Sequence, residues 1–182
     1  MLRTRVGYCG GKRESPTYWD LGDQTEAVSI DFDPMVLSFD DLLDHFWDGH
    51  HFGNEIRSTQ YRNAVFYRDE SQKERGEESR VRTAEKAGVS LDRVKTPLLP
   101  CGVFTYAEGY HQNYYLTSQR ALRAFLETTY PRVRSFADSA VATRLNGIMQ
   151  LGAASSFLTI QELTEFGLPD TVETSVRTAL GG

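Results

Sequence analysis

The chain has 182 residues, of which 40% are hydrophobic and 12% aromatic, and its formal net charge is −5. This size suits one domain with at most a short appended element, and the hydrophobic content is sufficient for a core, which excludes wholesale disorder. The acidic balance, without any run of five like charges, disfavours nucleic acid and anionic membranes as partners.

The first 117 residues show the alternation of strands and helices that is typical of a mixed α/β layer domain. Val28, Ile30 and Phe32 alternate with polar residues, which predicts a strand with one buried face. Ser38 followed by Asp41 predicts a capping box at a helix start. The predicted elements are strand 3–7, loop 12–24, strand 28–32, helix 38–48, loop 50–59, strand 61–67, helix 70–87 and strand 89–99.

Beyond residue 117 the pattern is helical only. We therefore predict a domain at 1–117 and a helical C-terminal extension at 118–182, with a flexible joint at 152–156. The fold class is α/β, as a two-layer α+β sandwich with an all-helical tail. The predicted helices of this half are 108–116, 118–129, 136–148, 159–166 and 170–180.

Two cysteines, Cys9 and Cys101, are too few for a disulfide framework and indicate a reducing compartment. No stretch approaches the ~20 apolar residues of a membrane span, and the N-terminus lacks a signal-peptide core, so we expect a cytoplasmic protein without a membrane partner. Cys9 lies beside Gly10, where open backbone amides favour a thiolate; the alternative is a small side chain at a turn. Cys101 carries the same two interpretations.

Three histidines near the end of the first helix invite comparison with a metal site. His45 and His50 are five residues apart, which does not place two ligands on one helix face. No nearby acid or cysteine completes a ligand set with His51. We therefore predict a polar cluster at the helix end and no metal.

A polar pocket is predicted around Glu26, which opens the second strand. Tyr18 in the preceding loop and Tyr61 at the next strand flank this acid. An acid between tyrosines is able to donate a hydrogen bond or a proton to a substrate oxygen. A surface acid and two rings at the edge of the core are the alternative, and spacing alone does not decide between these interpretations.

Six motifs in order over residues 3–117 resemble the peptide-methionine (S)-S-oxide reductases, the A-type methionine sulfoxide reductases. The branch that the chain resembles has a shortened loop before the glutamate and a helical C-terminal extension, which ATRLNG at 142–147 fits. The motifs are VGYCGG at 6–11, PTY at 16–18, TEAVSIDFDP at 25–34, LLDHFWDGHH at 42–51, QYRNAVFY at 60–67 and AEGYHQNYYL at 107–116.

The resemblance implies an enzyme of protein repair that reduces methionine S-sulfoxide, in oxidised proteins or as the free amino acid, without a bound cofactor. A cysteine attacks the sulfoxide sulfur, becomes a sulfenic acid, and is recycled by thioredoxin or another thiol. By position, Glu26 is the proton donor to the sulfoxide oxygen, and Tyr18 and Tyr61 are its hydrogen-bonding partners. Cys9 and Cys101 remain possible secondary thiols.

Two departures from the family pattern matter. The family places its attacking cysteine in a GCFWG motif about twenty residues before the GY-GG segment, and we expect that this N-terminally truncated chain lacks it and is inactive alone. An inactive paralogue that acts as a binding or scaffold protein is the alternative. Ile56 stands where the family usually has an aspartate.

Overall fold

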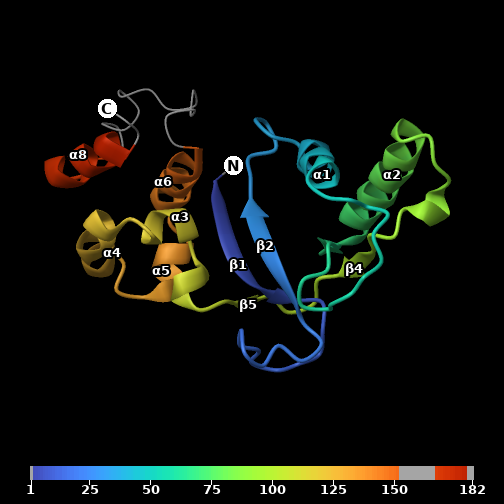
Figure 1. Ribbon diagram of the computed structural model, residues 1–182, viewed down its shortest axis with the longest axis horizontal. Helices are drawn as coiled ribbons and strands as arrows, with labels where there is room; N and C mark the ends of the chain where they lie inside the picture. Colours follow the sequence, from blue (N-terminus) through green and yellow to red (C-terminus); the bar gives the residue numbers. More distant parts are fainter. Residues whose placement is uncertain (1, 152–166, 180–182) are drawn as a thin grey trace. The chain divides into compact units, whose positions relative to one another are not determined.

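The structure, a computed structural model, describes residues 2–151 and 167–179 (Figure 1). The chain forms two compact units: Gly7–Ala107 is the first, and Leu2–Val6 with the chain from Glu108 onward is the second. The sequence-based boundary at residue 117 stays a proposal about independent folding, which a truncation experiment measures. Within the described residues, no helix has the length and apolarity needed to span a membrane.

Two small sheets are present. In the three-stranded sheet the order is β2-β1-β5, and β1 runs antiparallel to β5 with Gly7 opposite Tyr106. In the two-stranded sheet β3 runs parallel to β4, with Val65 opposite Leu98. The strands are β1 (Arg3–Cys9), β2 (Thr25–Asp31), β3 (Val65–Tyr67), β4 (Leu98–Pro100) and β5 (Thr105–Tyr106).

Helix α2 (Glu70–Lys86) packs on the β3–β4 sheet of the first unit, and α1 (Phe39–Asp48) packs against α2 (Figure 1). The predicted capping box is confirmed, because the Ser38 side chain accepts from the Asp41 N–H while the Asp41 side chain accepts from the Ser38 N–H. The indole N–H of Trp47 in α1 donates to Ser79 of α2 over 2.9 Å. The buried core here is Leu43, Trp47, Val65, Ala84 and Val94.

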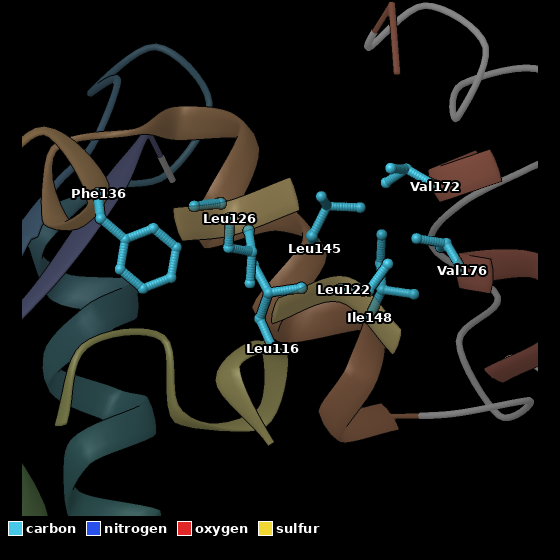
Figure 2. Packing of buried hydrophobic residues seen from close by; sticks show 9 residues of the cluster. Leu116, Leu122, Leu126, Phe136, Leu145, Ile148, Val172 and Val176 are labelled. Atoms are coloured by element: carbon cyan, nitrogen blue, oxygen red, sulfur yellow. The ribbon is translucent and has the colours of Figure 1, made fainter. Parts of the chain in front are cut away.

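The second unit has its own apolar core, in which side chains from several short helices converge (Figure 2). The buried Gln112 side chain also pairs with the backbone of Val6, accepting from its N–H at 3.0 Å and donating to its carbonyl at 2.8 Å. The helices are η2 (Gly109–His111), α3 (Tyr114–Thr117), η3 (Arg120–Leu122), α4 (Arg123–Thr129), α5 (Val133–Ala137), α6 (Ala140–Leu151) and α8 (Asp170–Ala179).

The α/β class is confirmed, and helices follow the last strand as predicted. The single helix predicted at 108–116 is two short helices, because Asn113 between them adopts φ +47°. The helix predicted at 136–148 is likewise divided, since the Ser139 side chain caps the start of α6. The predicted joint at 152–156 and helix at 159–166 lie outside the described residues.

Three strand predictions need correction. The strand predicted at 89–99 is wrong: Leu91–Arg93 forms a 3-10 turn, η1, and only Leu98–Pro100 is extended. The strand predicted at 61–67 shortens to Val65–Tyr67, and the N–H of Glu26 donates to the carbonyl of Gln60 in the loop before it. Val28 of β2 is 59% exposed instead of buried, since it lines an open groove.

Candidate functional site

The loop between β1 and β2 is fixed by two acceptors at its end. The Asp23 carboxylate accepts from the backbone N–H groups of Lys12 and Arg13 at 2.9 Å, and these bonds hold its pKa below the usual value. The buried Gln24 side chain accepts from Gly11 at 3.0 Å and donates to the Arg13 carbonyl at 2.9 Å. The loop therefore returns to β2 with a defined path and delivers Glu26 at the strand start.

Four side chains then form one hydrogen-bonded series, which we name the acid–tyrosine network: Tyr18, Tyr61, Gln60 and Glu26. The hydroxyl oxygens of Tyr18 and Tyr61 are 3.1 Å apart. The Gln60 side-chain amide donates to the Tyr61 hydroxyl at 3.0 Å and to Oε1 of Glu26 at 2.8 Å. The structure thus brings together the three residues that the sequence singled out.

The network combines a half-buried acid with exposed phenols. Glu26 is partly buried, and its backbone N–H donates to the Gln60 carbonyl at 3.0 Å, whereas Tyr61 is 62% exposed. The hydrogen bond with Tyr18 raises the pKa of Tyr61 above its ordinary value of 10.0. Tyr61 is therefore a neutral hydroxyl at physiological pH, able to donate to an oxygen acceptor.

Two hollows adjoin the network within the first unit. One, of about 420 Å³, is polar and includes Tyr61, Glu55 and Ile56 in its wall. Ile56 is 49% exposed and gives this hollow an apolar side chain. The other, of about 390 Å³, is a groove bordered by Glu26 and by both cysteines.

Cys9 and Cys101 are buried and lie beside one another; we name them the thiol pair. Cys9 is the last residue of β1, so its interpretation as a turn residue is wrong. The backbone N–H of Gly10 donates to the Cys101 carbonyl at 3.0 Å, and the two thiol groups are close enough to shift each other's pKa. Because Gly10 has φ +83°, it is the residue that lets the chain turn away here.

The pKa values of the two thiols shift in opposite directions. Hydrogen bonding to Cys101, burial and the Cys101 charge raise the pKa of Cys9. The hydrogen bond from Cys9 and the nearby Arg68 guanidinium lower the pKa of Cys101 to about 6. Of the two thiols, Cys101 is therefore the one that ionises first, while Cys9 keeps its proton.

Of the three histidines near the end of α1, His50 is held by two hydrogen bonds. Nδ1 of His50 is 2.8 Å from the Phe46 carbonyl, and Nε2 is 2.8 Å from the Thr96 hydroxyl. Over residues 2–151 and 167–179, no group of three or more His, Cys, Asp or Glu side chains is placed to hold a metal ion.

Sequence reasoning missed Gln60 and Arg68. Gln60 lies in a motif quoted for the resemblance, but nothing in its spacing distinguishes it from a surface amide. Arg68 directly follows β3, and only the pairing of β3 with β4 carries the chain to Cys101, whose N–H donates to the Tyr67 carbonyl at 2.8 Å. Both residues depend on tertiary contacts, which local patterns do not encode.

Comparison with known proteins decides what this arrangement belongs to. A family profile described as "Peptide methionine sulfoxide reductase" matches residues 1–142. The chain belongs to the peptide methionine sulfoxide reductase family. The predicted resemblance is thereby confirmed, and with it an oxidoreductase family of protein repair.

Individual relatives show how much of their length is shared. A peptide methionine sulfoxide reductase of Drosophila melanogaster is 37% identical over 150 residues, which are 82% of this chain and 59% of the fly protein. The MsrA proteins of Methanothermobacter thermautotrophicus and Bacillus subtilis are each 41% identical, over 63% and 60% of this chain and 72% and 66% of their own lengths. Because the chain spans 59% of the fly relative, its own activity, substrates and partners are proposals.

Proposed function

We propose that this chain supplies the oxygen-binding half of a site that reduces methionine S-sulfoxide, in oxidised proteins or as the free amino acid. The acid–tyrosine network carries the proposal, because it gathers one carboxyl group and two phenolic hydroxyls within hydrogen-bonding distance of each other. The sulfoxide oxygen is a strong acceptor, and hydroxyl donors held in place recognise such a group.

Glu26 is assigned the proton transfer. When a thiolate attacks the sulfoxide sulfur, a sulfur–sulfur bond begins to form and the oxygen accepts a proton. The hydroxyl group then passes to the attacking sulfur as the sulfur–sulfur bond breaks, which leaves methionine and a sulfenic acid. Gln60 engages Oε1 of Glu26, and the proposal assigns Oε2 to the substrate oxygen. Tyr18 and Tyr61 hold that oxygen in place while the proton moves.

The attacking thiol of the family belongs to a GCFWG motif, and residues 1–182 contain no such motif. We therefore expect the 182-residue chain alone to bind the sulfoxide without turning it over. In the complete reaction a thiol passes through a sulfenic acid and is recycled by thioredoxin or another dithiol. Two free cysteines fit a reducing, cytoplasmic setting for this chemistry.

The test is binding of the two sulfoxide diastereomers of N-acetylmethionine methylamide to the 182-residue chain, followed by NMR. We expect saturable shifts at the acid–tyrosine network with the S form, and about tenfold weaker binding for Glu26→Ala. Glu127→Ala, in α4, is the matched control. If Glu26→Ala binds each diastereomer as tightly as the unaltered chain does, the proposal is contradicted.

Turnover with dithiothreitol is measured in the same samples. Binding without turnover agrees with the oxygen-binding half proposed here, and also with a paralogue that only binds. Reduction of the S form by this chain contradicts the assignment of the attacking thiol to a GCFWG motif.

A further inference from the structure

The backbone places the two cysteines of the thiol pair in neighbouring segments. The Gly10 N–H to Cys101 carbonyl hydrogen bond, at 3.0 Å, sets the two segments side by side as in paired strands. Paired strands are about 4.8 Å apart, which falls inside the roughly 4.4–6.8 Å separation of Cα atoms across a disulfide. The two thiols are close enough that each shifts the pKa of the other. Closing the S–S bond therefore requires little backbone movement.

The pair is buried but borders a groove. Cys9 is 1% exposed and Cys101 6% exposed, and both line the groove of about 390 Å³. A small oxidant reaches the sulfur atoms through the groove, whereas a folded protein surface does not. Such burial selects for small molecules and protects the product from bulk solvent.

The charges around the pair favour reaction at Cys101. Arg68 hydrogen-bonds the Cys101 sulfur and Arg62 adds a second positive charge nearby; both arginines also line the groove. The Cys9 thiol and the Arg68 guanidinium lower the pKa of Cys101 to about 6, although burial opposes them. A thiolate at neutral pH is the nucleophilic form.

We infer that Cys9 and Cys101 form a redox-active dithiol, in which Cys101 reduces a hydroperoxide and Cys9 closes an intramolecular disulfide. This inference is independent of sulfoxide reduction and of the acid–tyrosine network. It assigns to this chain a second redox site with its own oxidant, and it makes the groove the entry path for that oxidant.

The electrons and atoms balance over two steps. The Cys101 thiolate attacks hydrogen peroxide, so that an S–O bond forms, the O–O bond breaks, and the departing hydroxide takes a proton to become water. With the Cys101 charge removed, Cys9 ionises more readily because the neighbouring anion that held its proton is gone. Cys9 then attacks the Cys101 sulfur, the S–S bond forms, and a second water leaves.

An external dithiol returns the pair to its reduced state. Its thiolate attacks the disulfide, gives a mixed disulfide and then closes its own ring, so that the external dithiol is oxidised as Cys9 and Cys101 are reduced.

Mass spectrometry of the intact chain tests the inference directly. Hydrogen peroxide at one to two equivalents is expected to lower the mass by two hydrogen atoms, and dithiothreitol is expected to restore it. Cys9→Ser is expected to stop at the sulfenic acid, which dimedone traps, and Cys101→Ser is expected to lose the fast reaction. A chain that keeps its mass, or that forms only intermolecular dimers, overturns the inference.

A second measurement needs no cysteine variant, so it tests the inference even if Cys9→Ser and Cys101→Ser fail to fold. The rate of Cys101 alkylation by iodoacetamide is expected to reach half its maximum near pH 6, instead of near the ordinary ~8.5. Arg68→Gln is expected to raise that midpoint. At a pH below the midpoint, each unit by which the pKa of Cys101 rises slows the alkylation about tenfold. Arg75→Gln, whose side chain pairs with Asp40, is the matched control. An unchanged midpoint in Arg68→Gln, or one near 8.5 in the unaltered chain, contradicts the inference.

Discussion

The acid–tyrosine network and the thiol pair adjoin the same groove, yet they are built differently. Tyr61 of the network is 62% exposed and is held by neutral side-chain hydrogen bonds. The thiols of the pair are almost fully buried and are held by strand backbone. Exposed groups retain access to a large substrate, whereas buried groups acquire altered pKa values. The first arrangement suits recognition of a side chain, and the second suits chemistry on a small molecule.

The comparison predicts that the thiol region tolerates substitution far less than the network. The first prediction concerns Gly10, which follows Cys9 at φ +83°; a Cβ there would lie 2.3 Å from the Phe66 ring. We expect Gly10→Ala to lower the free energy of unfolding by about 3 kcal/mol, from backbone strain and overlap together. Urea denaturation followed by circular dichroism measures this loss.

Gly88→Ala is the matched control, since Gly88 has φ +66° but no atom within 4 Å of the added Cβ. It isolates the backbone strain, for which we expect about 1 kcal/mol. Equal losses in the two variants would show that the close packing between Gly10 and Phe66 contributes nothing, and the contrast between the buried and exposed regions would disappear.

The second prediction addresses the network through Gln60, which connects Tyr61 to Glu26. Gln60→Ala removes both side-chain hydrogen bonds but keeps the backbone carbonyl that accepts from the Glu26 N–H. We expect affinity for methionine S-sulfoxide to fall about tenfold, because Glu26 loses its orienting donor. The free energy of unfolding changes by less than about 1 kcal/mol, since the Gln60 side chain is partly exposed.

Calorimetric titration with the S-sulfoxide measures the first effect, and urea denaturation the second. Gln119→Ala, a half-buried glutamine of the second unit, is the control for loss of an amide side chain. A Gln60→Ala protein that binds normally but unfolds easily would assign Gln60 to structure instead of to the site.

The fold was predictable where the signals are local. Ser38 and Asp41 define the α1 start from four residues of sequence, and the structure has the same capping box. The exposure of Val28 was not predictable, because alternation reports which residues share a face and not whether another element covers that face. The local periodicity of apolar residues therefore locates the strands and helices. Whether another element covers a sheet face depends on contacts between residues distant in sequence.

The candidate site shows the same division. Tyr18, Glu26 and Tyr61 were selected from a motif, and the structure brings them together. The interaction between Cys9 and Cys101 joins residues 92 positions apart, and nothing in either local sequence indicates it. The lowered pKa of Cys101 depends on the position of Arg68, which is known only from the tertiary structure.

The smallest effect predicted concerns the ionisation of Tyr61. Its pKa is raised above 10.0 chiefly by the hydrogen bond with Tyr18, so the phenol stays protonated as the pH rises through 10. Tyr18→Phe removes that partner, and we expect the Tyr61 titration to move down toward its ordinary value. Subtracting the ultraviolet titration of a Tyr18→Phe, Tyr61→Phe double variant from that of Tyr18→Phe isolates the Tyr61 signal without the Tyr18 hydroxyl. Subtracting the titration of Tyr61→Phe from that of the unaltered chain gives the reference with the hydroxyl present. If Tyr61 titrates identically with and without the Tyr18 hydroxyl, the two phenols are neighbours that do not act as one unit. The network would then contain only Glu26, Gln60 and Tyr61. A downward shift, by contrast, establishes that even the exposed region is coupled, through weak neutral bonds where the buried pair uses charge.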